Sequence, residues 1–550
     1  MDHEKVGMTF NKKSLSIAEN PQLFSDYLYA FENLSSFFRW HPEKDLQICL
    51  EKRQQNYQLR KKIPEILVRQ NQHFKNSAQL VQTLEKLKAD NTMAIVTGQQ
   101  VGLYGGPLYT IYKIITVLKL ADHLAERYPE WQFVPLFWME VGDSDYQEIN
   151  HFYLINQLNE LVRLGLPETP DNHQSIYHRK IPAEITQLRE QLKKLFPDND
   201  FRDAILDNVQ ESYAPGRSFH TAFAEWIQYL LADSGIPMIF PADQSLAELA
   251  QPIYQKTLQD WQIIQQHFSN TNRQLQQQKY HVQIQLDPGQ TLLFYEADDG
   301  SRSRIDGENG NFLIRSPQVR QKISEEELFK KLSQQPERFT PNVALRPVIQ
   351  DWLFPTVIYV AGPGEISYAA QLKPVYENLQ IIPPVFYPRL RISLIESKIE
   401  KVVSKFKVDI TEIFELREEW LEQKIQRQAD TQFNKLFQDS GSIIKNEMIK
   451  LQESLSQLDP ALDWSTQKTA TNMLELLDKL RQKTDEAYLR KMNSDLSQLN
   501  KVLTNLFPGG NFQERTVNIL QYIIKYGPEF IKKLYDSVDI HDRHHQLIFL

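Results

Sequence analysis

Four glycines gather within nine residues of a chain that has only 19 glycines in 550 residues. They lie between a short apolar run and an amphipathic segment, which predicts a turn from a strand into a helix. Such a turn presents backbone N–H groups and a helix N-terminus, which bind anions well. The spacing fits neither the dinucleotide fingerprint nor the P-loop, and a tight turn with positive φ is the alternative explanation. The candidate substrate- or nucleotide-binding residues here are Gly98, Gln99, Gln100, Gly102, Gly105, Gly106, Tyr109 and Lys113.

A second group of polar side chains follows the next apolar run. Asp143, Asp145 and His151 could bind an ammonium group or act as a general base, and we expect them to be catalytic. Trp138 and Asn150 are binding candidates in the same segment. A solvated acidic loop with a helix cap is the alternative. Because this segment and the glycine turn both follow parallel strands, we expect both to face one cleft.

A third group surrounds a second glycine turn much later in the chain. Arginine side chains there could hold a carboxylate through paired hydrogen bonds, with surface salt bridges as the alternative. A glutamate at the start of the following helix could instead serve as a cap. The binding candidates of this group are Arg346, Gln350, Asp351, Gly362, Gly364, Glu365, Tyr368 and Arg389.

These three groups need a sheet that brings the ends of distant strands together. Short apolar runs that alternate with helical segments predict βαβ units and a parallel sheet. The runs lie at residues 93–97, 133–138, 236–240, 356–360 and 384–387. We therefore predict an α/β fold with a Rossmann-like parallel-sheet core over residues 1–390.

Three stretches of the core depart from this pattern. Residues 1–90 and about 152–232 show helical spacing of apolar residues, which predicts a helical N-terminal part and a helical insertion. Residues about 278–345 contain alternating runs separated by turns, which predicts a mixed, mainly antiparallel insertion.

The C-terminal part has a different texture. Residues 391–506 contain almost no Gly or Pro, and their apolar residues recur at spacings of three, four and seven. The dipeptide Asp459-Pro460 interrupts the pattern, which predicts an antiparallel coiled-coil hairpin, with part of a globular helical domain as the alternative. Residues 507–550 are expected to be a helical segment that returns to the core.

A possible second ligand patch lies in that last segment. Arg515, Asn518, Tyr522 and Tyr526 are spaced by three and four residues, so on one helix they would share a face. A cation, an amide and two aromatic rings suit phosphate contact and base stacking, and a buried packing face is the alternative.

Composition excludes several classes of protein. A net charge of -8 gives no case for nucleic acid or an anionic membrane as partner, and one cysteine excludes a disulfide framework. No apolar run is long enough to span a membrane, and the opening residues 1–5 lack the pattern of a signal segment. We expect a cytoplasmic protein without a bound metal cluster. The histidines of residues 541–545 suggest a mobile tail more than a metal site.

Long motifs in this chain resemble the bacillithiol biosynthesis cysteine-adding enzymes. The similarity extends from about residue 95 to residue 530 and covers both glycine turns and the segment 137–151. It also covers Tyr387-Pro388-Arg389, the segment 506–515 and Tyr526-Gly527-Pro528. Several long motifs in the same order make the resemblance specific.

The resemblance implies a Rossmann-like core and a coiled coil that mediates homodimerisation. It also implies a ligase that forms an amide (C–N) bond between the carboxyl group of cysteine and the amine of glucosaminyl malate. Because a carboxylate does not condense with an amine unaided in water, we expect activation by ATP with magnesium. Two alternatives stay open: a non-catalytic nucleotide-binding dimer scaffold and an enzyme of nucleotide-sugar metabolism.

Overall fold

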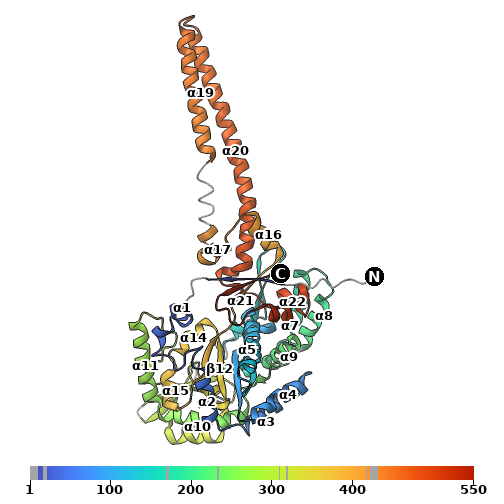
Figure 1. Cartoon of the computed structure of the whole chain (residues 1–550), viewed down its shortest axis with the longest axis vertical. Coiled ribbons are helices and arrows are strands. Elements are labelled where there is room, and N and C mark those ends of the chain that lie inside the picture. Colours follow the sequence, from blue (N-terminus) through green and yellow to red (C-terminus); the bar gives the residue numbers. More distant parts are fainter. Residues whose placement is uncertain are drawn as a thin grey trace. The chain divides into compact units, whose positions relative to one another are not determined.

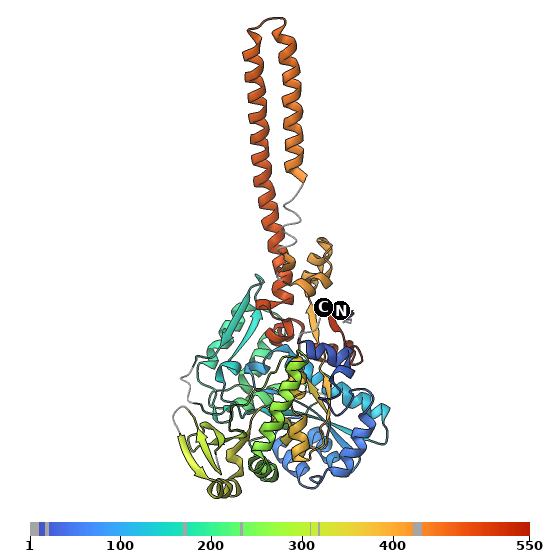
Figure 2. The ribbon, with the colours of Figure 1, turned by 90° about the vertical axis from the view of Figure 1, so that its left-hand side faces the viewer.

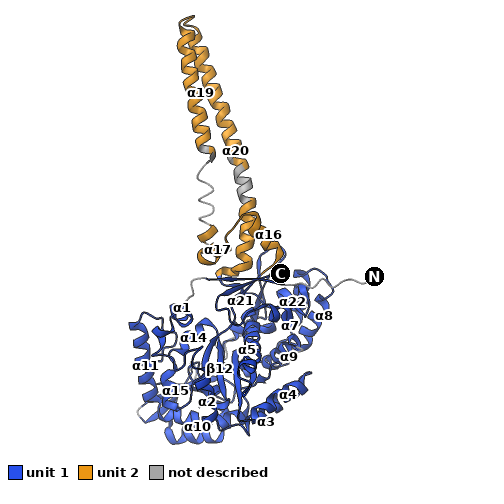
Figure 3. Cartoon of the chain, viewed as in Figure 1, with its two compact units in different colours: residues 1–394, 511–550 blue, residues 395–510 orange. Residues whose placement is uncertain are grey.

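The computed structural model describes residues 10–16, 21–168, 173–231, 235–308, 310–316, 320–417, 419–421 and 432–550. The opening segment considered above as a possible signal therefore lies outside the described residues. The chain forms two compact units, Met1–Leu394 with Asn511–Leu550 and Ile395–Gly510 (Figure 3). Each is described separately below.

A five-stranded parallel sheet forms the centre of the first unit (Figure 1). Its strands are β2 (Thr92–Gln100), β3 (Gln132–Glu140), β6 (Met238–Ile239), β12 (Thr356–Ala361) and β13 (Val385–Pro388). The spatial order is β6-β3-β2-β12-β13, so the third, second, first, fourth and fifth strands along the chain lie side by side. This is the doubly wound order, whose topological switch point lies between β2 and β12. The predicted Rossmann-like sheet is confirmed.

Both faces of the sheet are buried, which explains the continuous apolar runs in its strands. Along β2, Met93 and Ile95 join one hydrophobic core, whereas Ala94 and Val96 join the other. The first core is completed by α5 (Leu108–Arg127), α9 (Phe219–Leu230) and α22 (Leu520–Tyr526). The second is completed by α3 (Ile63–Asn71), α10 (Gln244–Gln259), α13 (Arg346–Leu353) and α15 (Lys373–Leu379).

The two insertions differ in how well they match the prediction. The stretch 152–232 begins with an unforeseen hairpin of β4 (His151–Ile155) and β5 (Leu161–Gly165), followed by α7 (Ile185–Leu195), α8 (Arg202–Ser212) and α9. The stretch 278–345 contains the expected antiparallel sheet, which lies apart from the central sheet in Figure 2. Its elements are β7 (Gln290–Glu296), β8 (Arg302–Glu308), β9 (Asn311–Arg315), β10 (Arg320–Ser324), β11 (Phe339–Pro341) and α12 (Glu325–Gln334).

The two terminal regions pair with each other. The expected N-terminal helices are α1 (Gln22–Tyr29), α2 (Leu46–Asn56), α3 and α4 (Ser77–Glu85). Ahead of them, β1 (Asn11–Leu15) pairs antiparallel with β15 (His545–Phe549), and β14 (Ile392–Ile395) completes this sheet. The expectation of a mobile tail at residues 541–545 is therefore wrong, because His545 begins a strand and is buried.

The second unit contains the predicted coiled-coil hairpin. After α16 (Ser397–Lys405) and α17 (Ile410–Leu416), α19 (Gln432–Ser456) and α20 (Leu462–Leu506) run side by side, with Asp459 and Pro460 in the turn between them. The half-buried residues Phe437, Ile444, Met448 and Leu455 form the α19 side of the seam. No helix in the described ranges is both long and apolar enough to cross a membrane.

Candidate active site at the carboxyl edge of the parallel sheet

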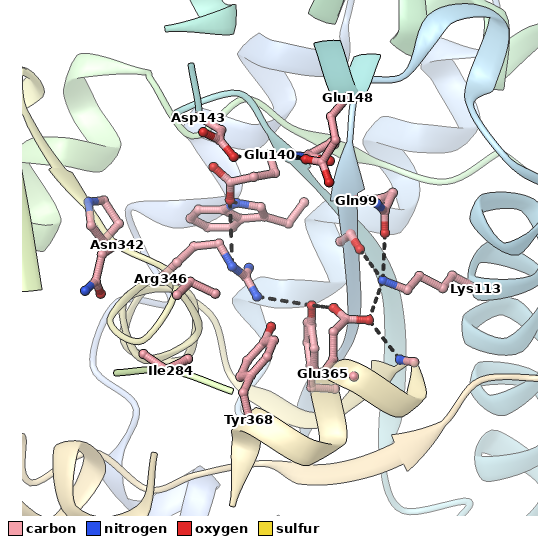
Figure 4. Close-up of a pocket in the computed structure, with 18 of the residues that line it drawn as sticks. Gln99, Lys113, Glu140, Asp143, Glu148, Ile284, Asn342, Arg346, Glu365 and Tyr368 are labelled. Carbon is pink, nitrogen blue, oxygen red and sulfur yellow. Dashed lines mark hydrogen bonds and ion pairs between the residues drawn. The ribbon is translucent and has the colours of Figure 1, made fainter. Parts of the chain in front are cut away.

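A cavity of about 590 Å³ lies at the carboxyl ends of β2, β3 and β12, beside the switch point of the sheet (Figure 4). This main cavity lies in the first unit. Ligands of open α/β sheets bind in this position, and the volume falls within the range of small-molecule sites. Its wall combines five positively charged and four negatively charged side chains, namely Lys113, Arg302, Arg346, Arg389, Arg515, Glu140, Asp143, Glu148 and Glu365.

Lys113 joins the two strands that flank the switch point. Its Nζ donates to the carbonyl oxygen of Gly98 at 2.8 Å and to Oε1 of Gln99 at 3.0 Å, both on β2. It also pairs with Oε2 of Glu365 at 2.5 Å, on α14 (Pro363–Ala369) after β12. Burial lowers the pKa of Lys113, and the pairing with Glu365 opposes this effect. Burial alone would raise the pKa of Glu365, but Lys113 holds it below its usual value.

Arg346 presents its guanidinium to the cavity from the first turn of α13. One terminal nitrogen donates to Oε1 of Gln350 at 3.1 Å, and the other donates to the hydroxyl of Tyr359 at 3.1 Å. Nε lies 3.7 Å from Oε2 of Glu140, which is beyond hydrogen-bond distance. Trp138 and Tyr359 present their rings to the same guanidinium at 5.7 and 5.5 Å.

Carboxylates occupy the opposite side of the cavity, as Figure 4 shows. Glu140 accepts hydrogen bonds from Nε1 of Trp138 at 3.3 Å and from the Gly142 N–H at 3.2 Å. Nε2 of Gln100 donates to Oδ2 of Asp143 at 3.2 Å and also to Glu148. One amide group therefore brings two carboxylates close together, which creates a place for a cationic ligand group.

The antiparallel insertion supplies another wall. Arg302 donates to Oγ1 of Thr340 at 2.9 Å and to the Pro341 carbonyl at 2.7 Å, and its guanidinium covers the ring of Phe294. Asn342 caps the start of α13 by accepting from the N–H groups of residues 344 and 345. The insertion thus encloses the cavity and fixes the entry into the helix that carries Arg346.

The positive charge of Arg389 is already paired within the protein. It forms a buried ion pair with Glu514 at 2.6 Å, and its guanidinium lies over the ring of Tyr109. Burial raises the pKa of Tyr109 to about 12, and the Tyr109 hydroxyl accepts from Nε2 of Gln99 at 3.2 Å. Arg389 therefore positions neighbouring groups more than it offers charge to a ligand.

The structure brings many residues of the three sequence groups to this one cavity. From the first group it brings Gly98, Gln99, Gln100, Tyr109 and Lys113, and from the second Trp138 and Asp143. From the third it brings Arg346, Gly362, Gly364, Glu365, Tyr368 and Arg389, and from the possible patch it brings Arg515.

The glycine turn is built differently from an anion-binding loop. Residues 101–106 are buried, and the N–H groups of Gly102, Gly105 and Gly106 donate to the carbonyls of Gln100, Gly102 and residue 103. Gly105 and Gly106 have positive φ values of 92° and 69°, which supports the turn explanation for these two. These three N–H groups are therefore engaged within the turn.

Gly98 serves close packing between strands. A Cβ at this position would lie 3.0 Å from the carbonyl oxygen and 3.2 Å from the Cβ of Trp138. Gly98→Val would therefore shift β2 against β3. Because of these contacts, Gly98→Val would disturb strand packing as well as any ligand contact, and it does not probe ligand binding alone.

Asp145 and His151 lie in a second cavity of about 330 Å³, which they line with Gly102 and Gly106. Asp145 caps the short helix α6 (Tyr146–Ile149), as the alternative explanation held. His151 contacts the side-chain oxygen of Asn150 at 3.1 Å, and burial lowers its pKa. We expected Asp143, Asp145 and His151 to share one cleft with the glycine turn. Asp143 instead lines the main cavity, whereas Asp145 and His151 line the second cavity. Glu148 and Arg515 line both cavities.

Three polar candidates are buried outside both cavities. Gln350 supports Arg346 and donates to Oδ1 of Asp351 at 3.0 Å. Asp351 is also bonded by Tyr376, and burial raises its pKa. Asn150 is fully buried beside the hairpin of β4 and β5. These residues hold the fold around the site and do not line the main cavity.

The helical face expected for the second ligand patch does not form. α21 (Gln513–Thr516) ends before Asn518, and α22 begins only at Leu520. Between them, Asn518 donates to the carbonyls of Tyr104 and Gly106 at 3.1 and 2.8 Å, which fastens the glycine turn. Tyr522 and Tyr526 stack on Phe530. Of the four, Arg515 lines both the main cavity and the second cavity, and its side chain is exposed.

Sequence reasoning missed several residues of the main cavity. Glu140 is the last residue of β3, and Glu148 lies within the acidic segment, so the position after a strand was an available signal for both. Tyr359 was taken only as part of a buried strand. Arg302, Phe294 and Asn342 come from the insertion, whose residue pattern does not indicate contact with the sheet edge. Among the described residues, no group of three or more His, Cys, Asp or Glu could hold a metal ion.

The fold and the site define a Rossmann-like α/β protein with a charged small-molecule cavity and an added coiled coil. Comparison with known families agrees in both parts. Residues 10–390 match the family described as bacillithiol biosynthesis BshC, N-terminal Rossmann-like domain. Residues 392–550 match the C-terminal coiled-coil domain of the same proteins.

Relatives that align over most of their length are named after the same family. The chain is 32% identical to the "Putative cysteine ligase BshC" of Salinibacter ruber over 96% of both chains. It is 30% identical to the protein of that name from Natranaerobius thermophilus, again over 96% of both chains. The corresponding protein of Chlorobaculum tepidum is 32% identical over 86% of both. The chain belongs to the BshC family of bacillithiol biosynthesis, which confirms the resemblance drawn from its motifs.

Proposed function

We propose that this protein is a cysteine ligase of bacillithiol biosynthesis, and that the main cavity is where it joins the carboxyl group of cysteine to the amine of glucosaminyl malate. Family membership supports the reaction. The observation that carries the choice of site is that one cavity holds Arg346 on one side and Asp143 and Glu148 on the other. Each substrate carries both a carboxylate and an amine, so a wall with a cation on one side and carboxylates on the other suits both.

The side chains of the cavity bind different substrate groups according to their charge. Arg346 binds a substrate carboxylate through the N–H groups that Gln350, Tyr359 and Tyr368 leave available. Asp143 and Glu148 hold an ammonium group near Gln100. Because only a neutral amine attacks a carboxyl carbon, one of these carboxylates accepts the proton that the amine loses. The antiparallel insertion limits access of water to the new bond.

Activation of the carboxyl group is a separate part of the proposal. ATP with magnesium would supply a phosphate-type leaving group on the cysteine carboxyl group, and the amine would displace this leaving group as it bonds to the carboxyl carbon. The groups expected to hold phosphate do not fit that role, since the N–H groups of the glycine turn and the ammonium of Lys113 have partners within the protein. We therefore assign no step to a nucleotide in the main cavity.

A cytoplasmic homodimer completes the proposal. On α19, the exposed residues Leu436, Ile443 and Leu451 are spaced by seven and eight positions and share one face, and exposed Leu458 follows in the turn after the helix. On α20, Met473, Leu476 and Leu480 form a matching exposed row. Helical phasing puts both rows on the same side of the antiparallel hairpin, flanking its seam. This apolar stripe suits the hairpin of a second copy.

Product formation tests the proposed reaction. Purified protein incubated with cysteine, glucosaminyl malate, ATP and magnesium should yield the amide, detected by mass spectrometry. Arg346→Met should lower the yield at least a hundredfold, because it removes the group that holds a carboxylate. Arg338→Met, which removes an arginine paired with Asp298 outside the cavity, is the matched control. Equal yields from the two variants would place the reaction elsewhere.

A further inference from the structure

A chain of hydrogen bonds and ion pairs runs along the floor of the main cavity. It links Lys113, Glu365, Tyr359 and Arg346, and these residues come from four different elements, α5, α14, β12 and α13 (Figure 4). The pairing of Lys113 with Glu365 spans 2.5 Å, the bond from the Tyr359 hydroxyl to Oε1 of Glu365 spans 2.8 Å, and the bond from Arg346 to Tyr359 spans 3.1 Å. We call these four residues the polar chain.

At one end of the polar chain, Lys113 has no proton left for a ligand. A lysine ammonium has three N–H groups. Three acceptors surround it, namely the Gly98 carbonyl, the Gln99 amide oxygen and the Glu365 carboxylate. The side chain of Lys113 is only 3% exposed. It therefore ties β2 to the start of α14 across the switch point.

In the middle of the polar chain, the direction of each hydrogen bond is fixed. Glu365 accepts from Lys113 and the Gly362 N–H on one oxygen and from Tyr359 on the other. The Tyr359 hydroxyl has a single proton, which it donates to Glu365, so its oxygen is free to accept from Arg346. A carboxylate at position 365 thus determines which way the Tyr359 hydroxyl points.

At the other end of the polar chain, Arg346 keeps N–H groups for a ligand. Gln350 and Tyr359 each take one of its five N–H groups and hold the two terminal nitrogens in place. Glu140 is too distant, at 3.7 Å, to satisfy Nε. The hydroxyl of Tyr368 also bonds to this guanidinium. A guanidinium held by three neighbours, with N–H groups left over, is prepared for a carboxylate.

We infer that Tyr359 is a positioning residue that orients Arg346 for a substrate carboxylate, and that Lys113 and Glu365 act through Tyr359 without touching substrate. The inference rests on the proposed function of Arg346. It gives Lys113 and Glu365, which the sequence suggested as ligand-binding residues, a different role. It also assigns a function to a strand residue that carries no charge.

Calorimetric binding of glucosaminyl malate in the absence of cysteine tests the inference. Tyr359→Phe removes one hydroxyl and should weaken binding about tenfold, the effect of losing one hydrogen bond to a charged group. Glu365→Gln should weaken it in the same direction, since the amide no longer fixes the Tyr359 proton. Tyr280→Phe is the matched control, because Tyr280 is also buried and bonded to a carboxylate, that of Asp26, but neither lines the cavity nor bonds to the polar chain. The control should bind as the wild type does.

A double-mutant cycle separates positioning from general loosening of the fold. In an Arg346→Met background, Tyr359→Phe should cause no further loss beyond about twofold, because the group it orients is gone. Equal additional losses in both backgrounds would overturn the inference, as would wild-type affinity in Tyr359→Phe. Wild-type affinity in Arg346→Met would instead contradict the proposed function of Arg346.

Discussion

Charged groups in the main cavity are mostly paired within the protein, whereas many apolar groups on the coiled-coil hairpin are exposed to solvent. Lys113 and Glu365 are largely buried and bonded to each other, and Arg389 is paired with Glu514. On the hairpin, Leu451 and Leu476 are 49% and 65% exposed. The cavity satisfies most of its polar groups internally, whereas the hairpin leaves much of its apolar surface without cover.

We propose that this difference indicates where the cavity binds its ligand and where the hairpin binds another protein. Buried charges are costly unless they are paired, so the few incompletely satisfied groups, above all Arg346, identify the ligand position. Exposed apolar side chains in a continuous row are costly in water, so we propose that the apolar stripe binds a protein partner. A group that the fold leaves unsatisfied is thus more informative about function than a group that it buries.

The largest effect is expected from breaking the buried pair in the cavity. Lys113→Met leaves the Glu365 carboxylate without its counter-charge and should lower the free energy of unfolding by about 3–5 kcal/mol. Urea unfolding followed by tryptophan fluorescence measures this loss. The double variant Lys113→Met/Glu365→Leu should recover much of it, because it removes both charges. A loss below about 1 kcal/mol in the single variant would mean that the pair is solvated.

Charges placed on the apolar stripe should break the opposite region without affecting the cavity. Ile443→Glu/Leu451→Glu should weaken self-association about a hundredfold, since each buried charge lacks a partner. Sedimentation velocity at micromolar concentration measures the change. Ile449→Glu is the control, because Ile449 is also exposed but lies on the other side of α19. A charge at Ile444, which lies in the seam within the hairpin, would test hairpin stability instead. A wild-type monomer would reject the dimer.

How far the sequence predicted these regions depends on local pattern. The apolar runs of β2 and β12 are continuous because both faces are buried, so the parallel sheet was readable from residue order. The hairpin was readable from spacing alone. β4 and β15 were not foreseen, because their pairing partners, β5 and β1, are not marked by a distinct local signal.

The cavity was only partly predictable for a related reason. Position after a strand pointed to Gln99, Asp143 and Glu365, which do line it. The role of each residue depends on contacts between distant segments, such as Lys113 with Glu365 or Asn518 with Gly106. Spacing in one helix could not reveal that residues 517 and 518 leave the helix to bond Leu108 and Tyr153.

As the pH falls, protonation of a buried histidine should destabilise the unit that contains the main cavity. The hairpin contains no histidine and should not be destabilised in this way. His545 is buried beside Ser393, Glu514, Arg389 and Arg391, and burial lowers its pKa to about 4. The unfolded chain therefore binds a proton between pH 6.5 and 4 that the folded chain does not, so stability is lost as pH falls through this window. Urea unfolding should show a loss of about 2 kcal/mol between pH 6.5 and 4.5 from this residue.

The matched variant His545→Gln should reduce that loss, whereas residues 395–510 contain no histidine and contribute nothing of this kind. Glu365 and Glu514, whose pKa values are lowered, lose their stabilising effect only below the unfolded value of 4.5. An unchanged pH dependence in His545→Gln would show that His545 is protonated in the fold.

The smallest expected effect has an unusual sign. Glu140 lies 3.7 Å from Nε of Arg346 and competes with a ligand carboxylate for it. Glu140→Gln keeps the size of the side chain and removes the charge, so Arg346 should bind glucosaminyl malate about threefold more tightly in calorimetry. Weaker binding would show that Glu140 holds the amine of this substrate.

A crystal structure with both cysteine and glucosaminyl malate bound tests the central claim most directly. The account predicts a substrate carboxylate within hydrogen-bond distance of Arg346 and a substrate amine beside Asp143 and Glu148, all inside the main cavity. Both substrates in the second cavity, beside Asp145 and His151, would contradict it.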